Sequence, residues 1–146
     1  MSPQQPFERG PAARRPVRVL IVEDHQGFRE KLQLFINTLD GYACSQTAST
    51  GAAALESVRN HPSDVALIDF SLPDTDAIEL ICELDREVPG LRCLVISGHE
   101  DPRFAQRAIN HGASGYVIKG EPLELKDALA AVMAGQIYLA KVLRTD

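Results

Sequence analysis

Residues 65–71, with the sequence VALIDFS, are the stretch that decides the fold of this 146-residue chain. Four apolar residues run without interruption from Val65 to Ile68, which is typical of a strand covered on both faces of a parallel sheet. The run ends at the carboxylate of Asp69. Because ligands of open α/β sheets bind at the carboxyl ends of the strands, this stretch predicts a site as well as a sheet. Taken alone, the pattern fits equally well a loop that begins at Asp69.

Four further strand patterns alternate with helix patterns along the chain. The five strands are predicted at residues 17–22, 42–48, 65–71, 91–96 and 114–118. The five helices are predicted to begin after Asp24, Thr50, Pro73, Asp101 and Glu121 and to end near Gly41, Asn60, Val88, Gly112 and Gly135. Strict alternation with right-handed crossovers predicts an α/β fold, a doubly wound five-stranded parallel sheet of the flavodoxin-like (βα)5 type with strand order 2-1-3-4-5.

Polar side chains stand where four of these strands end, and the topology predicts that they meet at one edge of the sheet. They are Glu23, Asp24, Asp69, Ser97 and Lys119. The adjacent acids Glu23 and Asp24 repel each other unless a cation lies between them, although Asp24 is also placed to cap the first helix. Mg²⁺ prefers one or two carboxylates together with water and a phosphoryl oxygen. A carboxylate beside such an ion, with Lys119 opposite, can attack phosphorus and have the new charge neutralised.

Composition and charge exclude several classes of protein. The formal charge of −5 argues against a general nucleic-acid surface, and without residues 1–18, which hold four Arg and one Glu, the body has 11 basic and 19 acidic residues, or about −8. No apolar run approaches the ~20 residues that span a bilayer, and no secretion signal is present. Cys44, Cys82 and Cys93 lack metal-ligand spacing and are interpreted as reduced, packed thiols. We therefore expect a cytoplasmic protein with no membrane partner.

Four segments together resemble a known family, the receiver domains of two-component response regulators. They are VEDH at 22–25, LIDFSLPDTDAIEL at 67–80, VISGHED at 95–101 and GYVIK at 115–119. They occur in the family order and at the family spacing, and the resemblance covers about residues 17–138. The stretches VEDHQGFRE and GASGYVIKG are most similar to the subclass with a LuxR-type helix-turn-helix output.

The resemblance implies a function and a metal site. Asp69 is the implied phosphoacceptor, which takes its phosphoryl group from a sensor histidine kinase or a phosphotransfer protein. Glu23 and Asp24 are the implied acidic pair of the magnesium site. Asp24, Asp69 and the backbone carbonyl of Ser71 are the implied protein ligands of Mg²⁺.

The resemblance also implies a switch. Ser97 and Lys119 are the implied ligands of the phosphoryl group, and Tyr116 is the aromatic residue that changes rotamer as Ser97 moves. The ring of Tyr116 is expected near the sheet edge, where it can choose between an apolar pocket and solvent. Residues 102–135 are then expected to change on activation, either at a protein–protein interface or in a phosphorylation-dependent homodimer.

The chain departs from the family pattern at several positions. Asp74 and Ala77 replace glycines, which predicts a stiffer and more acidic loop after the phosphoacceptor. Gly120 replaces the proline that usually follows the lysine, so the usual cis peptide is in doubt. His99 is interpreted as a solvent-facing loop residue rather than a group that influences hydrolysis.

Other functions remain as alternatives. A degenerate receiver would bind partners without phosphorylation. A phosphatase or mutase that uses an aspartyl phosphate would carry a second acid two residues after the nucleophile, where this chain has Ser71. A dinucleotide binder would need a G-x-G-x-x-G motif after the first strand, which is absent. At most, we expect the chain to catalyse its own phosphorylation and dephosphorylation.

The predicted organisation is a disordered tail at 1–16, a receiver domain at 17–138, and a C-terminal tail or the start of a linker at 139–146. LuxR-type relatives continue into a DNA-binding domain at this point. The eleven residues after Gly135 cannot build a helix-turn-helix, so the chain as it stands is not expected to bind DNA directly. A stand-alone regulator is slightly favoured over a receiver cut from a longer protein.

Overall fold

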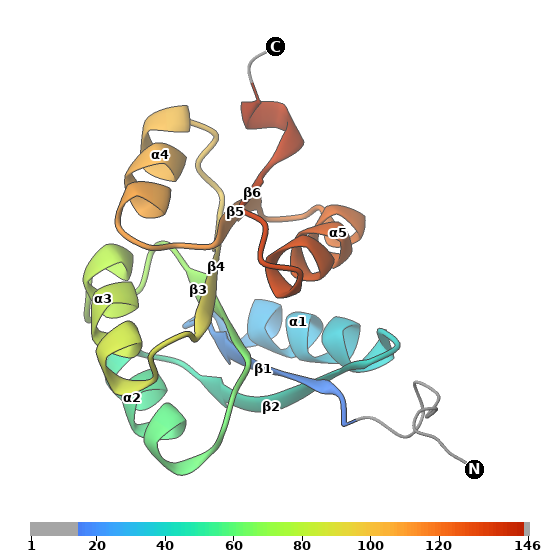
Figure 1. The fold of residues 1–146 in the computed structure, drawn as a ribbon, viewed down its shortest axis with the longest axis vertical. Coiled ribbons are helices and arrows are strands. Elements are labelled where there is room, and N and C mark those ends of the chain that lie inside the picture. Colours follow the sequence, from blue (N-terminus) through green and yellow to red (C-terminus); the bar gives the residue numbers. More distant parts are fainter. Residues whose placement is uncertain (1–14, 145–146) are drawn as a thin grey trace.

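The computed structural model describes residues 15–144, so nearly all of the tail expected at 1–16 lies outside the described residues. Strands and helices alternate along the chain (Figure 1). The elements are β1 (Val17–Val22), α1 (Gln26–Thr38), β2 (Tyr42–Ala48), α2 (Gly51–Asn60), β3 (Val65–Asp69), α3 (Ala77–Glu87), β4 (Arg92–Ser97), α4 (Pro102–Asn110), β5 (Gly115–Ile118), α5 (Pro122–Met133), β6 (Tyr138–Leu139) and a 3-10 helix (Lys141–Leu143).

The strands form one parallel sheet in the order β2-β1-β3-β4-β5-β6. The predicted order 2-1-3-4-5 is confirmed, but the predicted count of five strands is wrong. After Gly135 the chain turns back, and β6 pairs with β5 through hydrogen bonds from Tyr138 N to Ser114 O (3.0 Å) and from Ala140 N to Tyr116 O (2.8 Å). A strand of two residues is too short to produce an alternating pattern, so sequence periodicity could not reveal it.

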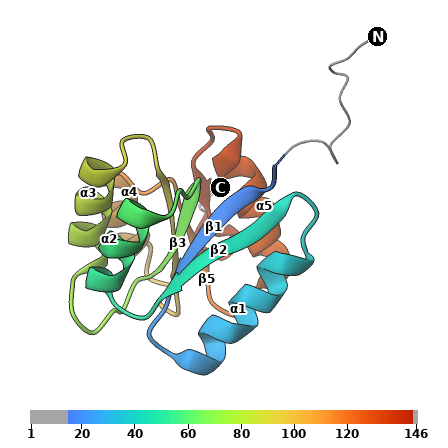
Figure 2. The ribbon, with the colours of Figure 1, turned by 90° about the horizontal axis from the view of Figure 1, so that it is seen from below.

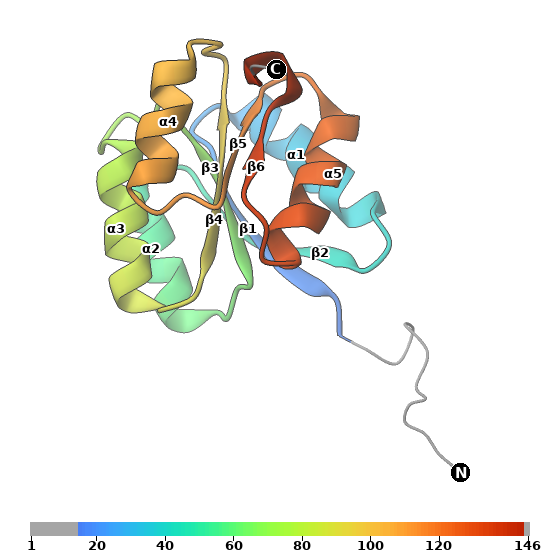
Figure 3. The same ribbon diagram turned by 45° about the horizontal axis from the view of Figure 1, so that its top comes forward.

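Helices cover both faces of the sheet. Helices α1 and α5 lie on one face, and α2, α3 and α4 lie on the other (Figures 2 and 3). Strand β3 is buried along its whole length because its side chains alternate between the two cores. Val65 and Leu67 join the core under α1 and α5, whereas Ala66 and Ile68 join the core under the other three helices. The uninterrupted apolar run in VALIDFS therefore reports a strand with both faces covered.

Two helix starts differ from the sequence prediction. Asp24 is exposed and does not cap α1; His25 is the N-cap, and its Nδ1 accepts a hydrogen bond from Phe28 N at 3.2 Å. Helix α3 begins at Ala77 rather than soon after Pro73, because Asp76 caps it by accepting a hydrogen bond from Ile78 N (2.7 Å). Sequence analysis did not identify His25 because imidazole is an uncommon N-cap, whereas Asp is a preferred one. In the structure the carboxylate of Asp24 instead lies near Glu23 and Asp69.

The loop between β3 and α3 is tied to α2 by Asp74. Its carboxylate accepts hydrogen bonds from Gly51 N (2.9 Å) and Ala52 N (3.2 Å), which are free backbone donors at the start of α2. The bond from Gly51 is the main reason that the pKa of Asp74 lies below its usual value. The acidic residue that replaces a family glycine thus holds this loop against the neighbouring helix.

The C-terminal segment expected to be a tail or linker packs against the domain over its described part. Ala140 and Leu143 are buried in the same core as α4. The carboxylate of Glu124 on α5 accepts hydrogen bonds from Tyr138 Oη (2.9 Å) and from Lys141 N (2.6 Å). Burial and the bond to Glu124 raise the pKa of Tyr138 to about 12.

The three cysteines are free thiols, and burial raises the pKa of Cys93 to about 12. Among the described helices, none is long and apolar enough to cross a membrane.

Asp64 anchors the start of β1 to the start of β3. Its carboxylate accepts hydrogen bonds from Arg15 Nη1 (3.0 Å), Arg18 Nε (3.1 Å), Arg18 Nη2 (3.1 Å) and Arg18 N (2.8 Å). Burial alone would raise the pKa of Asp64, but the bonds from the two arginines outweigh it and hold the pKa well below its usual value. The two arginines therefore have an acidic partner within the domain.

We predict that Asp64→Asn lowers the free energy of unfolding by about 1–2 kcal/mol at pH 7, because the hydrogen bonds lose their charge. A depressed folded-state pKa stabilises the protein above the unfolded-state pKa of about 3.9, and this contribution disappears as the pH falls toward the folded-state value. Urea unfolding at pH 7 and pH 3 should therefore show a smaller difference between variant and wild type at pH 3. Asp40→Asn, in the exposed turn after α1, is the control. A difference that does not change with pH would contradict the prediction.

Candidate functional site

The carboxyl ends of the central strands bring the predicted site residues together at one edge of the sheet. Glu23 and Asp24 follow β1, and Asp69 ends β3. One side-chain oxygen from each of these three acids lies within 4.8 Å of the others. We call these three residues the acidic triad. Ser97 ends β4 and Lys119 follows β5, at the same edge.

Glu23 is completely buried, although it is a charged residue. Its Oε2 accepts a hydrogen bond from His25 N at 3.0 Å. Its Oε1 has no hydrogen-bond partner within the described chain, and only the ammonium of Lys119 lies at ion-pair distance, 3.3 Å away. Burial raises the pKa of Glu23, and the neighbouring charge of Asp69 raises it further. The buried oxygen Oε1 therefore depends on Lys119, whose ammonium it shares with Asp69.

Lys119 lies between two buried carboxylates. Its Nζ is 3.3 Å from Oε1 of Glu23 and 3.3 Å from Oδ1 of Asp69, and it lies 5.0 Å from the centre of the Phe28 ring. Partial burial favours the neutral amine, but the attraction of Asp69 and Glu23 outweighs it and raises the pKa of Lys119. The amine therefore stays protonated at neutral pH and carries the charge that offsets the two acids.

Ser97 and Tyr116 are joined through the backbone of His99. Oγ of buried Ser97 accepts a hydrogen bond from His99 N at 2.9 Å, and the hydroxyl of Tyr116 donates to His99 O at 2.9 Å. The ring of Tyr116 is fully buried, which raises the pKa of its hydroxyl. The ring of Tyr116 was expected either in an apolar pocket or in solvent, and in the structure it lies in the apolar pocket.

A cluster of aromatic rings surrounds this connection, and the sequence analysis did not identify it. The ring of Phe70 packs edge-on against Tyr116, Phe104 and His99, with centroid distances of 6.1, 5.3 and 6.0 Å. His99 is exposed as predicted, but its ring also packs on Phe104 at 4.8 Å. The position of Phe70 directly after the carboxylate of Asp69 was the available signal.

The loops that follow Asp69 and Lys119 complete the site. Ser71 N donates a hydrogen bond to Oδ1 of Asp69 at 3.1 Å, and the side chain of Ser71 is exposed. The peptide bond between Lys119 and Gly120 is trans, since residues 15–144 contain no cis peptide. Gly120 instead has a positive φ of 93°, a conformation that glycine adopts without strain.

The donor set of the acidic triad fits a hard divalent cation. All of the side-chain donors are carboxylate oxygens, which suit Mg²⁺ rather than softer metals. Glu23 and Asp69 share the single ammonium of Lys119, and Asp24 adds a third carboxylate, so the triad carries more negative charge than Lys119 alone offsets. Three acids and one lysine at this edge can hold a cation beside a carboxylate nucleophile.

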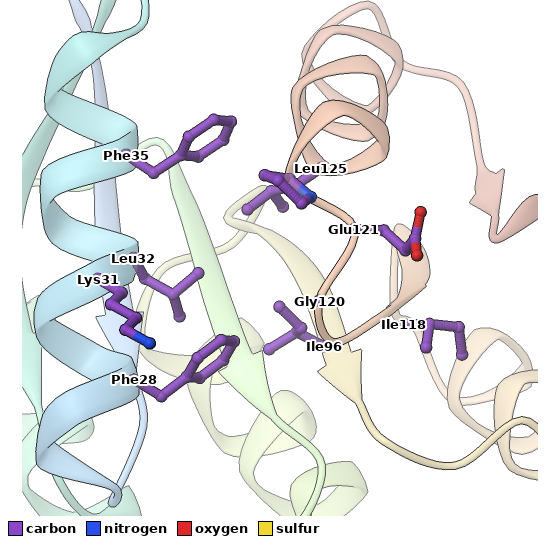
Figure 4. Close-up of a pocket in the computed structure, with 10 residues that line it drawn as sticks. Phe28, Lys31, Leu32, Phe35, Ile96, Ile118, Gly120, Glu121 and Leu125 are labelled. Atoms are coloured by element: carbon purple, nitrogen blue, oxygen red, sulfur yellow. The ribbon is translucent and has the colours of Figure 1, made fainter.

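A groove opens beside the site, between α1 and α5 (Figure 4). The cavity has a volume of about 280 Å³. Its walls are mainly apolar, with Phe28, Leu32 and Phe35 on α1 facing Leu125 and the loop at Gly120 (Figure 4). Periodicity along a helix predicts which side chains face inward, but it cannot show that the packing between two distant helices leaves a gap.

Arg29 is a second residue that the sequence analysis missed. Its Nη1 donates to the backbone carbonyl of Glu23 at 2.9 Å and lies 3.4 Å from the carbonyl of Asp24. It lies on α1, opposite the loop that carries both acids.

Comparisons with known proteins identify the family of this chain. The family described as the response regulator receiver domain matches residues 19–131. The response regulator GacA of Pseudomonas viridiflava is 31% identical over 125 residues, which are 85% of this chain and 58% of GacA. The transcription regulator BvgA of Bordetella pertussis is 33% identical over 122 residues, 83% of this chain and 58% of BvgA. The chain thus spans less than two thirds of the length of these relatives.

Solved structures show the same fold. A LuxR-family response regulator from Aurantimonas sp. SI85-9A1 is 30% identical, with a TM-score of 0.83 over 88% of this chain and 92% of that one. The receiver domain of NarL from Mycobacterium tuberculosis is 29% identical, with a TM-score of 0.78 over 84% of this chain and 100% of that domain. The predicted resemblance to the LuxR-type subclass is confirmed. The chain belongs to the receiver domains of two-component response regulators.

Proposed function

We propose that Asp69 accepts a phosphoryl group from a phosphohistidine of a sensor histidine kinase or a phosphotransfer protein, with Mg²⁺ bound at the acidic triad. The observation that carries this proposal is the position of Lys119 Nζ, 3.3 Å from Asp69 Oδ1, beside the acidic triad. An ammonium beside the nucleophile is suited to neutralise the oxygens of an incoming phosphoryl group. The relatives GacA and BvgA are named as regulators, which supports the same role.

The chemistry follows from the groups at the site. An oxygen of Asp69 attacks phosphorus, the bond from phosphorus to the histidine nitrogen breaks, and the nitrogen keeps the electron pair. Asp24, Asp69 and the backbone carbonyl of Ser71 would hold Mg²⁺, with Glu23 as the buried member of the acidic pair. The ion would supply charge neutralisation of the phosphoryl oxygens. Lys119 would pair with the same oxygens, and Ser97 would donate its hydroxyl to them.

We predict that acetyl phosphate with Mg²⁺ adds one phosphoryl group, measured by intact-mass spectrometry. Asp69→Asn should remove the adduct because it removes the nucleophile, and EDTA should remove it by taking the metal. The exposed Asp85→Asn is a matched control that should label normally. Labelling that persists in Asp69→Asn would refute the assignment, and a wild type that never labels would favour the degenerate receiver.

We further propose that Ser97 and Tyr116 form the switch. A phosphoryl group on Asp69 would draw the Ser97 hydroxyl away from His99 N, the group it now accepts from. Because Tyr116 is bonded to the carbonyl of the same residue, His99 would carry this movement to β5 and α4. The surface that changes would be residues 102–135. A partner protein or a second copy of the chain would bind to this surface.

We predict that the phosphoryl analogue beryllofluoride, with Mg²⁺, changes amide hydrogen exchange in residues 102–135. Ser97→Ala should bind the analogue but show a smaller change, because the hydroxyl that transmits the movement is gone. Tyr116→Phe keeps the ring and tests the bond to His99 separately. Light scattering on the same samples reports a homodimer. Exchange that is unchanged in the wild type at saturating analogue would rule the switch out.

The groove between α1 and α5 is our proposed docking surface for the kinase. It lies beside Lys119, so a partner seated there can bring its phosphohistidine to the same edge of the sheet. The apolar rings of Phe28 and Phe35 give it the aromatic anchors that strong interfaces use. Lys31 and Glu121 line the same groove and provide charges of both signs.

We predict that Phe35→Ala slows phosphotransfer from a kinase that phosphorylates the wild type by roughly tenfold, the effect of losing about 1.4 kcal/mol at an interface anchor. Phosphorylation by acetyl phosphate should be unchanged, because that donor needs no docking surface. Leu34→Ala is the matched control on the same helix, since Leu34 is exposed and does not line the groove. Unfolding curves of both variants show whether the fold is intact. Equal transfer rates for Phe35→Ala and wild type would exclude the groove as the docking surface.

A further inference from the structure

We propose that Arg29 is a positioning residue for the metal site, which holds the loop of Glu23 and Asp24 in the shape that binds a divalent cation. The inference rests on the proposed magnesium site and adds a residue that does not itself touch the metal. It concerns the backbone of the two acids, whereas the site described above concerns their carboxylates.

The contacts of Arg29 are directed at this loop. Nη1 donates to Glu23 O at 2.9 Å and approaches Asp24 O at 3.4 Å. Within residues 15–144 the guanidinium makes no ion pair with a carboxylate, unlike Arg18, Arg59 and Arg103. A half-buried arginine whose hydrogen bonds go to two consecutive carbonyls fixes the direction of the peptide planes that carry them.

The direction of these peptide planes matters because the two acids have opposite environments. Glu23 is fully buried and Asp24 is exposed, yet their carboxylates must remain within reach of one cation. Mutual repulsion favours a loop in which the carboxylates separate. Glu23 N donates a hydrogen bond to Ala48 O at 2.9 Å, and this bond fixes only the end of β1. Arg29 is the charged side chain that fixes the carbonyls beyond it.

The positive charge of the Arg29 guanidinium also offsets part of the negative charge of the acidic triad. The triad and Lys119 together carry an excess of negative charge, and the guanidinium of Arg29 lies against the backbone of two of the three acids. Residues that orient metal ligands through hydrogen bonds typically change metal affinity by about 10–100-fold when they are replaced. We expect Arg29 to fall in this range.

The test measures metal binding directly. Mn²⁺ is a hard cation suited to carboxylate and carbonyl ligands, and its free-ion electron paramagnetic resonance signal falls as it binds. Titration of Mn²⁺ into the wild-type chain gives the Kd, and Asp24→Asn identifies the site. Arg29→Met should raise the Kd at least tenfold. Arg29→Lys, which keeps the charge with a poorer fit to two carbonyls, should lie between the two. Arg59→Met, on an exposed arginine of α2 paired with Glu87, should bind Mn²⁺ like the wild type.

Urea unfolding without metal separates positioning from a purely structural role. A Kd for Arg29→Met equal to that of the wild type overturns the inference, whether or not the variant is less stable. If Arg29→Met does not fold, Arg29→Lys decides by the same criterion. If the wild type shows no saturable Mn²⁺ binding, or if its binding persists in Asp24→Asn, the proposed metal site is rejected and the inference is rejected with it. Binding that depends on Asp24 but not on Arg29 rejects the inference alone.

Discussion

The ammonium of Lys119, held between the buried carboxylates of Glu23 and Asp69, is the interaction on which the site depends. Two acids at the carboxyl end of a parallel sheet repel each other, and removal from water makes their charges costly. One lysine offsets only part of this charge, because Glu23 and Asp69 share its ammonium and Asp24 adds a third carboxylate. The remaining negative charge favours the binding of a cation at this edge of the sheet.

The rest of the molecule fixes the loops around this charged centre. Asp74 ties the loop after β3 to the start of α2, and Arg29 holds the loop after β1. Ser97 and Tyr116 both bond to the backbone of His99, so the loop after β4 is attached to the buried ring of β5. Hydrogen bonds from other elements thus fix three loops, those after β1, β3 and β4, at one edge of the sheet.

Strand β6 connects β5 to the C-terminal segment. Ala140 N donates to the carbonyl of Tyr116, and Glu124 holds Tyr138 and Lys141 in place from α5. The outer edge of β5 is therefore covered by the chain itself. Because these hydrogen bonds join β6 to β5, a movement of β5 would also move residues 138–140.

Local patterns determined the alternation of strands and helices, the strand order and the five polar residues at one edge, because each depends on periodicity or on the fixed direction of parallel strands. Tertiary structure decided the rest. Whether Asp24 or His25 caps α1 depended on the path of the backbone between β1 and α1. The hydrogen-bond donors to Asp74 are 22 and 23 residues away along the chain, so local sequence could not identify them. The sixth strand, the aromatic cluster around Phe70, the groove at Phe35 and the contacts of Arg29 arise from packing between separate elements. Such contacts produce no periodic pattern in the sequence, because they join residues that are close in space but lie at irregular distances along the chain.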